Sequence, residues 1–167
     1  MTPRRLTAEV EGEFVVFLIG MRINHPWRVS AWLPVFLAMP RMLRELQANP
    51  GLGLLAARFH GLTSVQYWRS LDQLHAYATS REKAHLPAWQ AFNRHARRAG
   101  GAVGIWHETY LVPPGQYETV YVDMPPSGLG RAGRLVPATG RRQTARGRLT
   151  GEGVESGGRS APPFPDP

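Results

Sequence analysis

Six histidines carry the side chains of this 167-residue sequence best suited to acid–base or metal chemistry, namely His25, His60, His75, His85, His95 and His107. An imidazole titrates near neutral pH, so it can act as a general base or as a metal ligand. The histidines form no H-E-x-x-H pair or other metal-ligand spacing, and the chain has no cysteine. No metal site, cysteine nucleophile or disulfide bond is therefore expected.

His107 is the first catalytic candidate, because it lies in the middle of a strand predicted over residues 103–112. A buried histidine there would serve as a general base, as a hydrogen-bond donor to a carbonyl or as a haem ligand. The alternative is a structural histidine in the core or at a subunit contact. The neighbouring Glu108 points to the opposite face of the strand, so the two cannot form an acid–base pair.

His85 is the second candidate, at the start of a helix predicted over residues 86–98. Trp89 follows at i+4 on the same face of this helix. Asn93, one turn after Trp89, is the polar group of the helix expected to meet a ligand. The alternative for His85 is a polar residue at the helix N-terminus with no role in a site.

A polar and aromatic loop follows the first predicted strand, residues 13–20. Arg22 can hold a carboxylate through two parallel N–H groups, and Asn24 can orient a carbonyl. Trp27 lies close by in the loop. Equally, Arg22 can pack its stem on Trp27 while its guanidinium pairs with a carboxylate.

Adjacent aromatic residues end the strand predicted over residues 63–69. Tyr67 and Trp68 must point to opposite faces, so one is expected to enter a cavity and the other to lie in the core or at a subunit contact. Met39 and Met42 offer a flexible ligand wall, but such methionines are more often core filling.

The elements that position these residues alternate between strand and helix. Apolar runs and turn residues predict strands over 13–20, 52–60, 63–69, 103–112 and 117–122, and helices over 31–48, 70–77 and 86–98. Pro40 is expected to kink or break the first helix. The order predicts an α+β fold, a ferredoxin-like antiparallel sheet with helices on one face.

Strand 103–112 carries large side chains on both faces, Trp106 and Tyr110 on one and Ile105 and Leu111 on the other. Helices cover only one face of the predicted sheet. A second copy of the chain is the economical cover for the other face, because two-fold pairing buries the same patch on both chains. The sequence therefore predicts a homodimer.

Composition changes near residue 125. Seven of the twenty basic residues follow it, against three acidic residues, which contributes +4 to the net charge of +8. No aromatic residue lies between Arg131 and Arg148 to stack on a base, so nucleic-acid binding is not expected. We predict a loose arm over 1–10, the main domain over 11–124, an Arg/Gly-rich extension over 125–149 and a disordered tail over 150–167.

The longest apolar runs, residues 14–21 and 33–39, are far shorter than the ~20 residues that a membrane helix needs. Acidic residues interrupt the N-terminal stretch where a signal peptide would be apolar. The sequence therefore predicts a soluble cytoplasmic protein without membrane contact.

Five strings together resemble a bacterial and fungal family labelled monooxygenase-like, within the dimeric α+β barrel superfamily: VVFLIGMRINHPWRV, WLPVFLAMPRMLREL, VQYWRSLDQLHAYA, AHLPAWQAFNR and VGIWHETYLVPPGQYETVYVDMPPSGLGRAG. The resemblance covers roughly residues 12–149 and implies that the extension wraps the dimer. The superfamily includes cofactor-free quinone-forming monooxygenases, haem-degrading enzymes, haem peroxidases and haem-dependent aldoxime dehydratases.

The resemblance implies a monooxygenase-like oxidoreductase that acts on a small aromatic or apolar molecule without flavin or metal. His107 or His85 would remove a proton, and Arg22 or Asn93 would stabilise the oxyanion. One alternative is a haem-dependent oxidoreductase or dehydratase, and the other is a ligand-binding dimer without turnover. The expected ligand-binding residues are Asn24, Trp27, Tyr67, Trp68, Trp89, Asn93, Trp106 and Tyr110.

Overall fold

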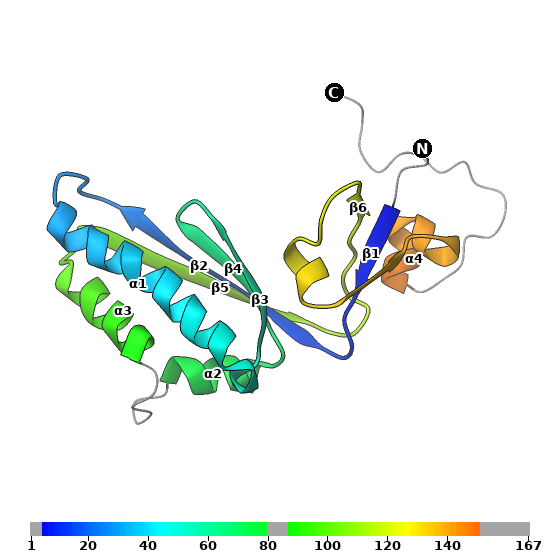
Figure 1. Cartoon of the computed structure of the whole chain (residues 1–167), viewed down its shortest axis with the longest axis horizontal. Coiled ribbons are helices and arrows are strands. Elements are labelled where there is room, and N and C mark those ends of the chain that lie inside the picture. The colour runs from blue at the N-terminus through cyan, green and yellow to red at the C-terminus, as the bar shows by residue number, and fades with distance from the viewer. Residues whose placement is uncertain (1–4, 80–86, 151–167) are drawn as a thin grey trace. The chain divides into compact units, whose positions relative to one another are not determined.

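The structure, a computed structural model, describes residues 5–79 and 87–150, without the side chains of 87–89 and 150. The chain divides into two compact units (Figure 1). The sheet unit comprises residues 14–111, and the terminal unit joins residues 1–13 to residues 112–167.

The sheet unit is built on four strands in the order β3-β4-β2-β5. Chain order alternates strands and helices as β2 (Phe14–Ile23), α1 (Val29–Ala48), η1 (Pro50–Leu52), β3 (Leu54–His60), β4 (Thr63–Trp68), α2 (Leu71–Thr79), α3 (Pro87–Arg98) and β5 (Val103–Val112). β4 pairs antiparallel with both β2 and β3. This is the predicted α+β, ferredoxin-like arrangement, in which each helical connection returns the chain to a non-adjacent strand.

The helices cover one face of this sheet. α1 packs against α3, and Figure 1 shows the two helices on the same side of the strands. The core between them and the sheet takes Val15 and Ile19 from β2, and Val35, Met42 and Leu46 from α1. We call this side of the sheet the helix face and the other side the open face.

Helix α1 contains Pro40 in its interior but does not end there, contrary to the expected break. A proline removes one backbone hydrogen bond and clashes with the preceding turn. Met39 and Met42, on either side of it, are both buried in the core. Packing of this face therefore holds the helix together across the proline, as tertiary contacts generally do for helices of marginal propensity.

Every second residue of β4 points into the helix-face core and is polar or amphipathic. Ser64, Gln66 and Trp68 are all buried. The Trp68 Nε1–H donates to Gln66 Oε1 at 2.9 Å, and the Trp68 ring lies 5.7 Å from that of Tyr77. Buried polar groups require such partners. Burial, with a smaller contribution from the charge of Glu45, raises the pKa of Tyr77.

The terminal unit holds a second, three-stranded sheet of order β6-β1-β7. It consists of β1 (Arg5–Glu9), β6 (Tyr121–Val122), η2 (Gly128–Arg131), β7 (Arg134–Pro137), η3 (Gly140–Gln143) and α4 (Ala145–Thr150). The prediction of a loose arm over residues 1–10 was therefore wrong for residues 5–9, which form the central strand. The partners of β1 lie more than a hundred residues away in sequence, as in Leu6 opposite Tyr121, so no local pattern marks it.

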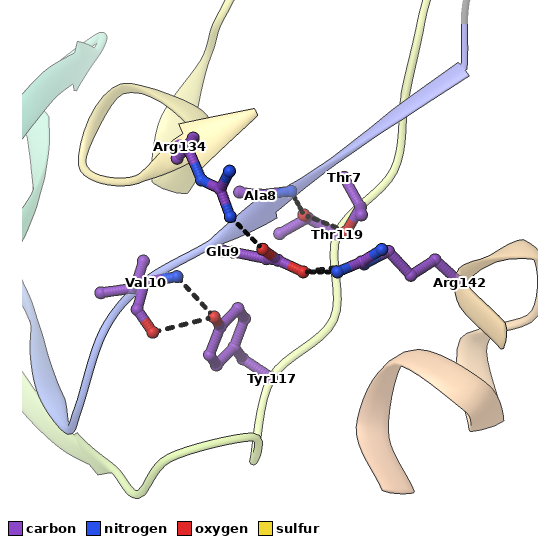
Figure 2. A network of polar contacts seen from close by, with 8 residues as sticks. All are labelled: Thr7, Ala8, Glu9, Val10, Tyr117, Thr119, Arg134 and Arg142. Carbon is purple, nitrogen blue, oxygen red and sulfur yellow. Dashed lines mark hydrogen bonds and ion pairs between the residues drawn. The ribbon is translucent and has the colours of Figure 1, made fainter. Parts of the chain in front are cut away.

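The strand predicted over residues 117–122 is reduced to β6 and pairs with β1 instead of extending the main sheet. The residues before it are attached by side chains. Figure 2 shows the Tyr117 hydroxyl between the two backbone groups of Val10, accepting from the N–H at 2.7 Å. The Thr119 hydroxyl accepts from the Ala8 N–H at 2.8 Å. These bonds replace a regular ladder with side-chain contacts.

The Arg-rich extension is tied to β1 of its own chain through Glu9. Arg134 donates to Glu9 Oε2 at 3.0 Å, and the Arg142 Nε donates to Oε1 at 2.7 Å (Figure 2). Wrapping of a partner subunit by residues 125–149 stays a prediction. The predicted tail over 150–167 lies outside the described residues, apart from the last position of α4.

We expect Trp68→Phe to lower the free energy of unfolding by about 1–3 kcal/mol, because it removes the buried donor to Gln66 Oε1. Urea unfolding followed by circular dichroism measures the change. Trp27→Phe is the matched control, because Trp27 is 77% exposed and substitution there should stay within about 0.5 kcal/mol. Equal losses in the two variants would contradict a specific role for the Trp68 hydrogen bond.

Candidate functional site

The predicted site residues of the sheet unit lie on both of its faces. Trp68 is in the helix-face core, and His107 lies on the same face, because its ring is 5.7 Å from that of Phe17, which packs on the core. Trp106 lies on the open face, against Gly20. Strand alternation places Tyr67 and Tyr110 on the open face as well. These residues therefore do not converge on one cavity within a chain.

His107 is exposed, although the sequence predicted a buried histidine at this position. β5 is an edge strand, with no further strand of the described residues beyond it, and the His107 side chain on its helix face is left exposed. The imidazole is thus accessible to a small molecule, with the Phe17 ring beside it. The arrangement places an imidazole next to an aromatic surface.

Asn24 and Trp27, the two candidates from the loop after β2, contact the turn before β5 and the same loop, respectively. The Asn24 Nδ2–H donates to the Gly101 carbonyl at 3.0 Å, and the Asn24 backbone N–H donates to that of Ala102 at 2.9 Å. Asn24 therefore joins the loop after β2 to the turn before β5, a structural role. Trp27 is exposed to solvent, with its ring 5.3 Å from His25.

Arg22 lies on the open face. Its Cβ is next to the position that a Cβ added at Gly104 would take, and strand alternation puts Gly104 on the same face of β5 as Trp106. Within one chain, Arg22 and His107 therefore lie on opposite faces of the sheet, and the role of Arg22 in a site stays a prediction. Asn93 is half-buried on α3. His85 lies outside the described residues, and Trp89 lies in α3 with a side chain that is not among those described.

Tyr110 and Glu108 form a polar pair on the open face. The Tyr110 hydroxyl donates to Glu108 Oε2 at 2.6 Å. This hydrogen bond and the negative charge of Glu108 raise the pKa of Tyr110. Glu108 is therefore directed to Tyr110 and away from His107, as strand alternation predicted.

An apolar cavity of about 200 Å³ lies between α1 and the strands on the helix face. Its lining consists of Met21, Phe36, Met39, Pro40, Phe59, Gly61 and Leu62. The sequence offered only Met39 among them as part of a flexible ligand wall, with core filling as the preferred interpretation, and no other residue of the lining was predicted to bind a ligand. Met39 and Met42 are both buried in the core, as is common for methionines at helical spacing, and Met39 also lines the cavity.

A second cavity, of about 630 Å³, lies in the terminal unit between β1, the turn over residues 114–117 and the η3–α4 segment. Arg148 lies in the wall of this second cavity, and its side chain is almost fully buried. The Arg148 Nε donates to Glu118 Oε2 at 2.7 Å, and Nη1 donates to the carbonyl of Arg142 at 2.8 Å. This arginine therefore holds the extension in shape by charge-assisted hydrogen bonds.

No histidine of the described part of the chain lines either of these cavities. Haem iron is usually held by a histidine, cysteine, methionine or tyrosine ligand in a pocket of suitable size. The apolar cavity holds no imidazole but has Met21 and Met39 in its lining, and the haem alternative stays a prediction. Within residues 5–79 and 87–150, no cluster of three or more histidine, aspartate or glutamate side chains could hold a metal ion.

Residues 14–129 match the family described as monooxygenase af470-like. The chain belongs to this family. Monooxygenase af470 of Aspergillus fumigatus is 34% identical over 135 residues, which cover 72% of this chain and 46% of the relative. This monooxygenase af470-like chain thus spans about half the length of that curated relative. No solved structure matches this chain. Family membership confirms the resemblance inferred from the sequence.

The family match contains the whole sheet unit and ends at Leu129, before most of the extension. In the described part of this af470-like chain, no helix combines the length and the apolar composition that a membrane span needs. The cytoplasmic location stays a prediction.

We expect Glu108→Gln to lower the pKa of Tyr110 toward its ordinary value, because the change removes the charged acceptor that favours the protonated phenol. NMR titration of ring-labelled tyrosine measures the shift. Glu45→Gln, on the other side of the sheet unit, is the control and should leave Tyr110 unchanged. An unaltered Tyr110 titration in Glu108→Gln would contradict the pairing.

Proposed function

We propose that this chain is a monooxygenase that acts on a small aromatic or apolar molecule without flavin or metal. Membership of the monooxygenase af470-like family supports the reaction class. One geometric observation supports the site: the accessible His107 imidazole lies 5.7 Å from the Phe17 ring on the helix face. A base beside an aromatic surface suits proton removal from a bound aromatic substrate.

In the proposed reaction His107 removes a proton from an activated CH₂ group of the substrate. The resulting carbanion transfers one electron to dioxygen, and the two radicals combine to a hydroperoxide. Loss of the second C–H proton and cleavage of the O–O bond leave a carbonyl and release water. Both oxygen atoms are accounted for and all electrons come from the substrate, so no external reductant is needed.

Asn93 is the proposed donor to the oxyanion that forms as the proton leaves. It is half-buried on α3, whereas Arg22 lies on the open face. An amide N–H placed near a developing oxyanion lowers the barrier without itself titrating.

The proposed substrates do not bind deep in the apolar cavity. Met21, in the wall of that cavity, is four residues from Phe17 on the same strand, which is about 13 Å along β2. Ile19 lies between them and is buried in the core. We therefore assign substrate to the surface at His107 and Phe17.

A ligand-binding protein without turnover is the second candidate function. The observation that favours it is the division of the predicted site residues between two faces, which leaves His107 without a described acid partner. Such a protein would bind an aromatic ligand at Phe17 and consume no oxygen.

We expect His107→Gln to lower the turnover number by about 10²–10⁴-fold with little change in the dissociation constant, because it removes the general base and keeps a polar side chain of similar reach. Oxygen uptake with phenolic substrates that carry an activated CH₂ group measures turnover, and fluorescence titration measures binding. His60→Gln is the control, because His60 is also exposed but lies at the end of β3.

Three results decide between these functions. Loss of turnover in His107→Gln alone supports the proposed base. Full turnover in that variant contradicts it. Saturable binding without oxygen uptake by the unmodified chain contradicts the monooxygenase and supports the second candidate.

We also propose that the chain forms a homodimer through the open face of the sheet. Trp106 and Tyr110 are exposed there, and no helix of the described residues covers them. Pairing of two such faces would remove these aromatic groups from water.

We expect Trp106→Asp to convert a dimer to a monomer in light scattering, because it places a charge in the proposed contact. Ile105→Asp is the matched control, since Ile105 is equally exposed on the other face of β5 and should leave the mass unchanged. A monomer in the unmodified chain would contradict the proposed dimer.

A further inference from the structure

Helix α1 has an exposed apolar side next to the side that packs in the core. Val29, Leu33, Phe36 and Leu37 are all exposed. Their spacing of four, seven and eight residues places them on one side of the helix, about a hundred degrees wide. A helix that covers a sheet normally presents polar residues on its outer side, so this apolar side is unusual.

The apolar side continues onto the neighbouring hairpin. Phe59 and Leu62, at the β3–β4 turn, are exposed and share the lining of the 200 Å³ cavity with Phe36. The cavity therefore reaches the surface among these residues. Trp27 is the most exposed of the large apolar residues of the described chain, and it lies in the turn that leads into α1. We call this set the apolar patch: Trp27, Val29, Leu33, Phe36, Leu37, Phe59 and Leu62.

The charges next to the apolar patch are positive. Arg28 precedes α1, and Arg41 and Arg44 are exposed on its second half. Glu45 is the one acidic residue in α1, and it is half-buried, where its charge acts on Tyr77. The whole sheet unit has eleven arginine and lysine residues against four aspartate and glutamate residues, a net charge of +7.

We propose that the apolar patch binds the surface of an anionic lipid bilayer. Apolar side chains enter the boundary between headgroups and acyl chains, and the flanking arginines are attracted to anionic headgroups. Tryptophan favours this interface because its ring is both apolar and polar. A second copy of the chain fits less well, because two positive rims would face one another across the contact.

This binding needs no membrane-spanning segment. The expectation that the chain makes no membrane contact rested on the absence of a long apolar run, which interfacial binding does not require. The bilayer would cover the mouth of the apolar cavity. The proposal does not depend on turnover at His107 or on the dimer, which uses the open face.

Sedimentation of the full chain with lipid vesicles tests the proposal. We expect binding to vesicles that contain phosphatidylglycerol and much weaker binding to vesicles of phosphatidylcholine alone, with a loss of binding as salt screens the arginines. Leu33→Ser with Leu37→Ser should weaken binding by about tenfold or more, because two apolar groups leave the contact. Ile105→Ser with Leu111→Ser is the control, as both residues are exposed on β5.

Two matched triple variants test the electrostatic contribution to vesicle binding. Replacing Arg28, Arg41 and Arg44 by glutamine should weaken binding to anionic vesicles by about a hundredfold, from roughly fivefold for each arginine. The control replaces Arg94, Arg97 and Arg98 of α3, which are exposed and change the net charge equally. Equal losses would show that overall charge drives binding and would overturn the proposal.

Tryptophan fluorescence gives a direct readout of contact. Addition of anionic vesicles should shift the emission to shorter wavelength, and Trp27→Phe should abolish most of that shift while circular dichroism shows a folded chain. An unchanged shift in Trp27→Phe would contradict insertion of the patch. Absence of sedimentation at low salt, or patch variants that alter the oligomeric mass but not vesicle binding, would likewise overturn the proposal.

Discussion

Burial of Trp68 against the helices, with its indole N–H bonded to Gln66, determines which face of the sheet looks inward. Side chains alternate along a strand, so Trp68 inside places Tyr67 outside. Pairing of Val15 with Trp68 carries the same assignment to β2 and directs Phe17 and Ile19 inward. A shift of the strand-pairing register by one residue would move every one of these side chains to the opposite face.

This constraint separates three surfaces with different chemistry. The helix face of β5 presents His107 beside Phe17, where an aromatic molecule and a base can meet. The open face presents Trp106 and the hydrogen-bonded pair of Tyr110 and Glu108. The outer side of α1 is apolar with arginines at its margin. The proposed substrate site, the proposed dimer contact and the proposed lipid-binding surface therefore lie on different sides of one small unit.

The terminal unit depends on different forces. Its central strand, β1, is held by strands far away in sequence and by Glu9, which receives hydrogen bonds from Arg134 and Arg142. Much of the acidic charge of the chain is gathered here, which leaves the sheet unit strongly positive. Exposed ion pairs contribute little stability individually, but Glu9 combines two of them with a backbone ladder.

The sequence by itself determined the α+β class and the order of elements of the main sheet. It also determined the opposite orientations of Tyr67 and Trp68 and of His107 and Glu108, and membership of the monooxygenase-like family. These follow from local periodicity and from long matching strings. Only the tertiary structure decided that Trp68, not Tyr67, enters the core, that β1 is a strand, and that α1 continues through Pro40. It also left His107 exposed and separated it from Arg22. Such outcomes depend on contacts between residues distant in sequence, whose free energies no local pattern reports.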